Sequence, residues 1–94
     1  MARLSEAEIT EHLAQRPDWS LENNNEIVRT FRLANFPAAI AFVTHVAFLA
    51  EAAGHHPDID IRYNRVRIAL TTHDAGGLTE KDFALAAAID EILG

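Results

Sequence analysis

The sequence predicts an α+β fold in two layers, a four-stranded antiparallel sheet with three helices packed on one face. Residues 19–33 and 58–71 each contain two short runs of alternating apolar and polar residues around a turn, the pattern of a β-hairpin. Three other segments, 5–16, 36–53 and 79–92, carry apolar residues at helical spacing. Because two separate hairpins make a poor sheet, we expect them to join under the helices as one domain, residues 1–94.

The first helix is predicted to begin at Ser5. Ser5 and Glu8 form a capping-box pattern, Leu4 and Ile9 are placed as a hydrophobic staple, and Pro17 closes the helix. The first hairpin follows, with a strand at 19–21, a turn at 23–25 and a return strand at 27–33.

The second helix, 36–53, is the longest apolar stretch of the chain. Asn35 is its expected N-cap, Pro37 suits its first turn, and Gly54 marks its end. It carries two apolar stripes, more than one partner layer would cover, and a 94-residue chain gains much from association. We therefore expect a homodimer or homotetramer.

The second hairpin is expected to turn at Asn64 and Arg65, because Asn tolerates the positive φ of a two-residue turn. Pairing outward from this turn gives Tyr63 opposite Val66, Ile61 opposite Ile68, Ile59 opposite Leu70 and His56 opposite His73. A slip by one residue would still leave His55 and His56 beside Thr71 and Thr72. Opposed residues have Cβ atoms about 5 Å apart, so the mouth of this hairpin should collect imidazoles.

After Gly76 and Gly77 the third helix is expected to start at Thr79, with Asp82 completing a second capping box. Capping alone is a sufficient purpose for Asp82.

The composition excludes several classes of function. The net charge of −6, with no basic stripe along the chain, argues against nucleic acid or a membrane surface as partner. There is no cysteine, hence no disulfide and no thiolate ligand or nucleophile. The N-terminus lacks the apolar core of a secretory signal and residues 36–53 are interrupted by polar side chains, so a cytoplasmic protein is expected.

Three histidines and two carboxylates carry the titratable chemistry: Glu51, His55, His56, His73 and Asp82. Taken singly, each has a structural explanation, and Tyr63 reads as a strand core residue. Their convergence favours a function, because clustered imidazoles repel one another and are costly to desolvate. General acid–base catalysis and a three-histidine metal site are both compatible with this cluster. We favour proton transfer, because adjacent His55 and His56 in an extended segment would point to opposite faces.

These residues resemble the signature of the pterin-4a-carbinolamine dehydratases. The resemblance rests on residues 51–57 (Glu-Ala-Ala-Gly-His-His-Pro), Tyr63, residues 71–73 (Thr-Thr-His) and Asp82, and it covers nearly the whole chain from Trp19 onward. Gly54 stands where some members have an acidic residue.

The resemblance implies dehydration of 4a-hydroxytetrahydropterin to quinonoid dihydropterin, without cofactor or metal, in recycling of the tetrahydropterin. His55 and His73 would be acid and base and His56 would hold the pterin. Supporting positions would be Glu51, Gly54, Pro57, Tyr63, Thr71, Thr72, Asp74 and Asp82, the last supporting the His73 loop, with Trp19 bordering the pocket.

The same resemblance implies partners. The pterin is the small-molecule substrate, and an aromatic amino-acid hydroxylase would work in the same pathway. The family also includes members that act by binding, as a dimerisation cofactor of a transcription factor or in assembly of a carbon-fixing enzyme. A non-enzymatic role of this kind is the alternative function.

Overall fold

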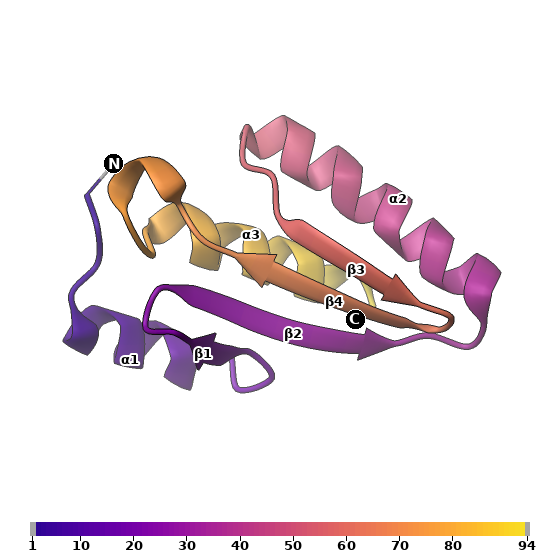
Figure 1. Ribbon diagram of the computed structural model, residues 1–94, viewed down its shortest axis with the longest axis horizontal. Helices are drawn as coiled ribbons and strands as arrows, with labels where there is room; N and C mark the ends of the chain where they lie inside the picture. The colour runs from indigo at the N-terminus through magenta and orange to yellow at the C-terminus, as the bar shows by residue number, and fades with distance from the viewer. Residues whose placement is uncertain (1, 94) are drawn as a thin grey trace.

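The computed structural model describes residues 2–93 as three α-helices, four strands and one short 3-10 helix (Figure 1). In chain order these are α1 (Glu6–Ala14), β1 (Ser20–Glu22), β2 (Glu26–Arg32), α2 (Phe36–Ala53), β3 (Asp58–Arg62), β4 (Arg65–Leu70), η1 (His73–Ala75) and α3 (Glu80–Ile92).

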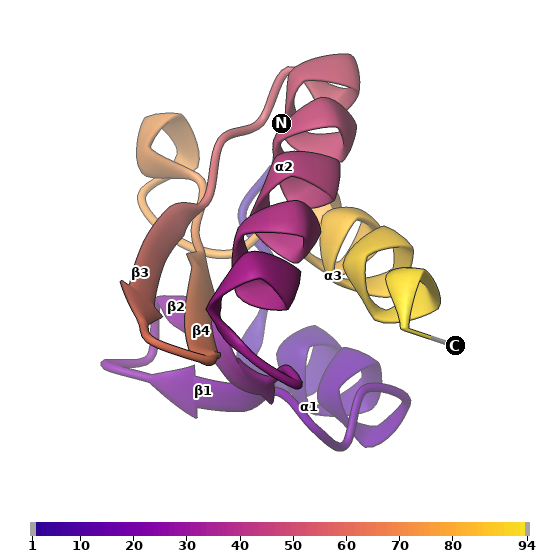
Figure 2. The same cartoon turned by 90° about the vertical axis from the view of Figure 1, so that its right-hand side faces the viewer.

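The four strands form one antiparallel sheet in the order β1-β2-β4-β3. The two hairpins therefore meet through β2 and β4, which occupy the centre. All three helices lie on the same side of this sheet (Figure 2). The predicted fold class is confirmed.

The helix ends lie where their capping residues predict. Ser5 and Glu8 make a reciprocal capping box, and Thr79 and Asp82 make another. Asn35 caps α2 by accepting a hydrogen bond from the backbone N–H of Ala38 at 2.9 Å. The hydrogen bond from the backbone of Ser5, followed by that from its hydroxyl, lowers the pKa of Glu8.

The helix α2 covers the centre of the sheet with one face and leaves another uncovered. Its buried face consists of Ala39, Phe42, Val46 and Ala50. By length and mean hydropathy, 1.6 over 18 residues, it is apolar enough to cross a membrane, contrary to our expectation from its polar residues. Only one face of α2 packs on the core, and 22% of this stretch is buried.

The first of the two registers considered for the second hairpin is wrong, and the structure has the alternative that is slipped by one residue. Arg62 pairs with Arg65 and Ile61 with Val66, so the turn consists of Tyr63 and Asn64. Tyr63 has a positive φ of 53°. It is 67% exposed and is therefore not part of the core. The side chain of Asn64 instead donates a hydrogen bond to the carbonyl of Leu33, which ties the turn to the end of β2.

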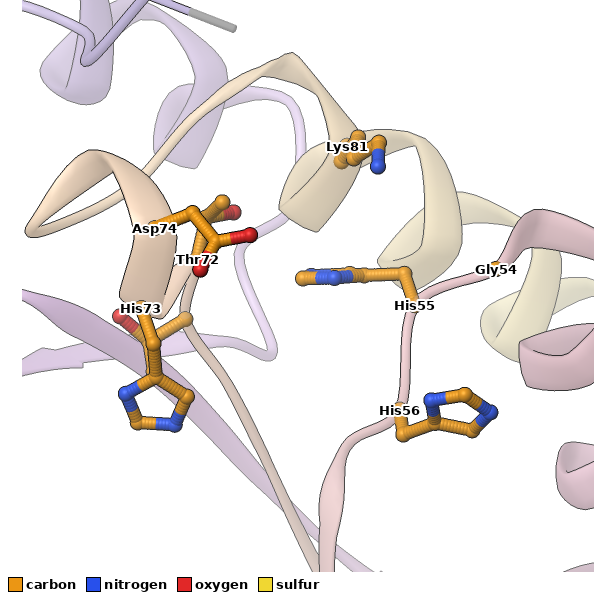
Figure 3. Close-up of a pocket in the computed structure, with 8 residues that line it drawn as sticks. Gly54, His55, His56, Thr72, His73, Asp74 and Lys81 are labelled. Atoms are coloured by element: carbon orange, nitrogen blue, oxygen red, sulfur yellow. The ribbon is translucent and has the colours of Figure 1, made fainter.

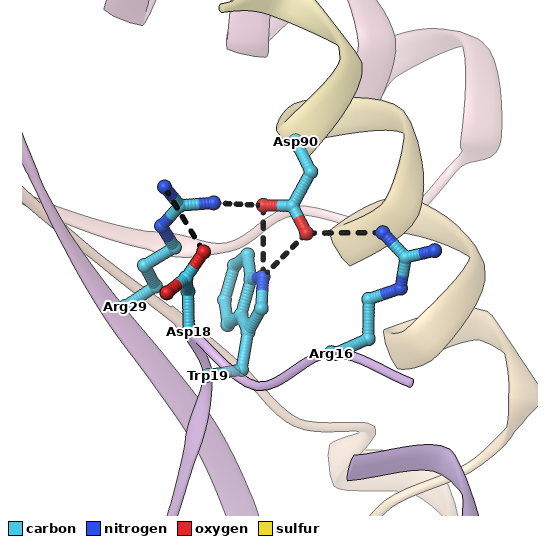
Figure 4. A network of polar contacts seen from close by, with 5 residues as sticks. All are labelled: Arg16, Asp18, Trp19, Arg29 and Asp90. Atoms are coloured by element: carbon cyan, nitrogen blue, oxygen red, sulfur yellow. Dashed lines mark hydrogen bonds and ion pairs between the residues drawn. The ribbon is translucent and has the colours of Figure 1, made fainter. Parts of the chain in front are cut away.

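Asp90, near the end of α3, binds three donors from the other end of the chain (Figure 4). Its carboxylate accepts hydrogen bonds from Trp19 Nε1 at 2.9 and 3.0 Å, from Arg29 at 2.6 Å and from Arg16 at 3.1 Å. Only 17% of the Asp90 side chain is exposed, whereas Asp18, 3.6 Å from Arg29, is 69% exposed. Asp90 therefore fastens α3 to β2 and to the segment between α1 and β1.

Asp90→Ala is expected to lower the free energy of unfolding by about 2–3 kcal/mol, because it leaves two part-buried guanidinium groups and an indole N–H without their acceptor. Asp18→Ala is the matched control and should cost less than about 0.5 kcal/mol, since its one ion pair is exposed. Urea unfolding followed by Trp19 fluorescence measures both. Equal losses in the two variants would contradict this role of Asp90.

Self-association is expected from the uncovered face of α2, where Phe36, Ile40 and Phe48 are 48%, 38% and 73% exposed. The purified protein should scatter light as a dimer or tetramer, and Phe48→Glu should shift it toward lower mass. A stable 10.4 kDa particle at micromolar concentration would contradict the expectation.

Candidate functional site

An open pocket of about 280 Å³ lies where α2, β4 and α3 come together at one end of the sheet (Figure 3). Its lining residues are Gly54, His55, His56, Thr71, Thr72, His73, Asp74 and Lys81. The three histidines thus line one pocket, although they come from two segments far apart in sequence.

Gly54 determines how the histidine pair enters this pocket. It ends α2 in the left-handed conformation, with φ of 62°, and its N–H bonds to the carbonyl of Glu51 at 3.1 Å. The N–H of His55 bonds to the carbonyl of Ala50 at 3.0 Å, which completes a Schellman motif. The chain therefore reverses within one residue, and glycine is the residue that does this without strain.

His55 and His56 extend to opposite sides of the segment that carries them (Figure 3). The side chain of His55 is only 10% exposed, and its Nε2 lies 2.6 Å from Oδ1 of Asp82. His56 is 69% exposed and lies 2.9 Å from Oε1 of Glu51, one turn before the end of α2. Each imidazole of the pair thus has its own carboxylate.

Asp82 is fully buried and accepts three hydrogen bonds. Besides His55, the donors are the hydroxyl of Thr72 at 2.8 Å and the backbone N–H of Thr79 at 2.9 Å. The hydroxyls of Thr72 and Thr79 also lie 2.9 Å apart. Asp82 thus contacts Thr72, the residue before His73, and it also binds His55, a contact that the sequence pattern did not predict.

The Asp82 contact fixes which nitrogen of His55 remains for chemistry. An ionised carboxylate accepts only, so the geometry assigns the proton on Nε2 to the shared hydrogen bond. Within residues 2–93, Nδ1 of His55 has no hydrogen-bond partner. A neutral His55 therefore offers Nδ1 as an acceptor, and a protonated one offers it as a donor, which is the behaviour of a positioned acid or base.

His73 occupies the opposite wall of the pocket, on η1. The 3-10 helix lies inside a loop closed by an antiparallel bridge between Thr72 and Gly77, whose backbone groups bond at 3.2 and 3.3 Å. His73 and Asp74 are exposed at the rim. His73 does not lie opposite His56 as the expected register required; extending the observed register places Thr71 there.

Several expected site residues lie away from the pocket, and one residue that lines it was not expected. Trp19 does not border the pocket, because it is buried at the far end of α3 on Asp90. Tyr63 is at the opposite end of its hairpin, and Pro57 only connects His56 to β3. Lys81, in the first turn of α3, lines the pocket but was missed, although its place beside Asp82 in the capping box was a usable signal.

The donor arrangement does not fit a three-histidine metal site. Among residues 2–93, no group of three or more His, Asp or Glu side chains is placed to hold a metal ion. His55 and His56 each bind a carboxylate on a different side, so their rings do not share a point.

Comparisons with known proteins show which proteins this chain and its fold are similar to. Residues 2–92 match the family described as "Pterin 4 alpha carbinolamine dehydratase". A relative from Chloroflexus aurantiacus, named "Putative pterin-4-alpha-carbinolamine dehydratase", is 94% identical over the full length of both chains. The solved structure of a transcriptional coactivator/pterin dehydratase from Brucella melitensis has a TM-score of 0.93 at 35% identity, covering 98% of this chain and 99% of that one.

A second similar solved structure is of a protein with a different described role. It is a pterin dehydratase-like protein identified as a RuBisCO assembly factor in the alpha-carboxysome, with a TM-score of 0.69 at 26% identity, covering 82% of this chain and 90% of that one. The family match along residues 2–92 and the near-identical relative lead to one conclusion: the chain belongs to the pterin-4a-carbinolamine dehydratase family.

Proposed function

We propose that this protein dehydrates 4a-hydroxytetrahydropterin to quinonoid dihydropterin by histidine acid–base catalysis. The observation that carries the proposal is the His55–Asp82 pair, which presents a free imidazole nitrogen to a pocket faced by His73. Family membership supports this reaction. The His55–Asp82 pair supports acid–base catalysis as its mechanism.

The elimination needs two proton transfers. The C4a–O bond breaks as the hydroxyl takes up a proton and leaves as water, and a ring N–H gives up a proton to restore neutrality. One imidazole donates and another accepts, and such groups typically contribute about 10²–10⁴-fold each in rate. His55 and His73, on facing walls, are the proposed pair.

The remaining lining residues serve binding in this proposal. His56, oriented by Glu51, holds the pterin, and the backbone and hydroxyl groups of Thr71 and Thr72 meet its donor and acceptor edge. The hydroxyl of Thr71 also donates to the carbonyl of Asn25 at 2.5 Å, which keeps this wall against the first hairpin. Asp82 is a positioning residue, because it acts through His55.

An assembly role is the second candidate, since one structural relative is described as a RuBisCO assembly factor. The two functions differ in what they require of the pocket. A chain that acts only by binding other proteins needs no imidazole with a free nitrogen held by a buried carboxylate. A carbinolamine decay assay with and without the protein separates them.

His55→Ala and His73→Ala are each expected to lower dehydratase activity at least about tenfold, because each removes a proposed acid or base. His45→Ala is the control, since His45 is exposed on α2 away from the pocket. Stopped-flow decay of the carbinolamine measures all three. Full activity in His73→Ala together with loss in His45→Ala would place the site elsewhere.

The positioning role of Asp82 has its own readout within the same experiment. Asp82→Asn should lower kcat with little change in KM, because the carboxylate that orients His55 is lost while the residues that line the pocket are kept. Thr72→Val removes a different donor to Asp82 and should lower kcat less. Equal losses of kcat in the two variants would mean that Asp82 acts only in holding the fold.

Activity is expected to survive exhaustive chelation, because two proton transfers on this substrate need no Lewis acid. Elemental analysis and assay before and after dialysis against EDTA check this. About one zinc, iron or copper per chain, with activity lost on chelation and regained on adding the metal back, would replace the proposed mechanism.

A further inference from the structure

One face of the sheet is covered by no helix (Figure 2). Four of the eight basic residues of this acidic chain lie on that face. Arg62 pairs with Arg65 across β3 and β4, and Arg65 pairs with Arg32 across β4 and β2. These three arginines therefore stand in one row across three strands. Arg67, two residues along β4, lies on the same face.

The orientation of this row follows from the buried face. Apolar residues alternate with the arginines along the same strands and pack against the helices. These are Phe31, Ile59, Ile61, Val66 and Ile68. Since neighbouring strand residues point to opposite faces, the arginines must point away from the core. We name Arg32, Arg62, Arg65 and Arg67 the arginine face.

Internal carboxylates neutralise only part of the arginine face. Arg62 lies 3.3 Å from Asp60, and Arg67 lies 2.9 Å from Glu22. Within residues 2–93, Arg32 and Arg65 form no ion pair. Like charges directly opposite in a sheet are destabilising, so the core gains nothing from this row.

A shallow pocket of about 280 Å³ lies on the arginine face, lined by Thr30, Asp60, Arg62, Arg65 and Arg67. Guanidinium groups bind carboxylates through two parallel hydrogen bonds, and the Thr30 hydroxyl adds a further donor. The face therefore has both the charge and the donor geometry for carboxylate groups.

From this we propose that the arginine face is a docking surface for an extended acidic segment of a partner protein. Arginines on adjacent strands are about 5 Å apart, so the row spans about 10 Å, and an extended peptide presents every second side chain on one side about 7 Å apart. Two carboxylates at positions i and i+2 thus fit along the row. The net charge of −6 on the whole chain opposes a long polyanion such as nucleic acid, whereas a short segment meets a local surface on which Arg32 and Arg65 form no ion pair within residues 2–93.

The test uses three fluorescein-labelled hexapeptides: alternating Glu and Thr, the same composition as a Glu block followed by a Thr block, and alternating Gln and Thr. Fluorescence anisotropy with the full-length protein at low salt should show binding of the alternating Glu peptide, at least threefold weaker binding of the block peptide and none of the Gln peptide. In ¹⁵N NMR spectra, the alternating peptide should shift the signals of the arginine face and leave those of His55 and Lys81 unchanged.

Arg65→Glu should weaken binding of the alternating peptide at least tenfold. Arg3→Glu, the same charge change at an exposed position off the sheet, should change it less than twofold. Both variants should keep dehydratase activity and thermal stability close to wild type, because neither residue lines the pocket of His55.

Three results would overturn the proposal: no binding of the alternating peptide at millimolar concentration, equal weakening by both variants, or tighter binding of a single-stranded oligonucleotide of equal charge. The last would make this a nucleic-acid surface instead.

Discussion

The arrangement of the pocket depends on the hydrogen bonds that the buried carboxyl group of Asp82 accepts. It joins the exit of α2 through His55, the exit of β4 through Thr72 and the start of α3 through Thr79. A buried carboxylate is costly unless its oxygens are satisfied, so these three segments are held together by the need to supply its donors. The helix cap and the orientation of the imidazole are therefore set by one group.

Local signals in the sequence predicted the architecture well. Three kinds of feature depend on residues close together in the chain: the capping boxes at Ser5 and Thr79, the left-handed helix end at Gly54, and the alternation in β3 and β4. Each lies where the sequence predicts it. Resemblance to a family then located the pocket residues that share a loop or a strand end. These features need no knowledge of which distant segments touch.

The errors have a common physical origin. The turn of the second hairpin uses Tyr63 at positive φ, which its side chain alone does not favour, because contacts of Asn64 with the end of β2 fix the turn from outside. Trp19 was assigned to the pocket as an aromatic wall, whereas its indole N–H meets Asp90 at the other end of α3. On the outer face, Arg62, Arg65 and Arg67 belong to the second hairpin, and Arg32 becomes their neighbour only through the pairing of β2 with β4. All three depend on long-range contacts.

The bridge between Thr72 and Gly77 has an evolutionary consequence. It closes the loop of η1 at its base, so β4 and α3 are held in register whatever lies between the two bridged residues. The four enclosed positions, which include His73, can change length or composition without passing strain into the sheet. Divergence of the pocket rim is thereby uncoupled from divergence of the scaffold, and relatives of this chain are free to exchange their chemistry at that loop while keeping the same fold.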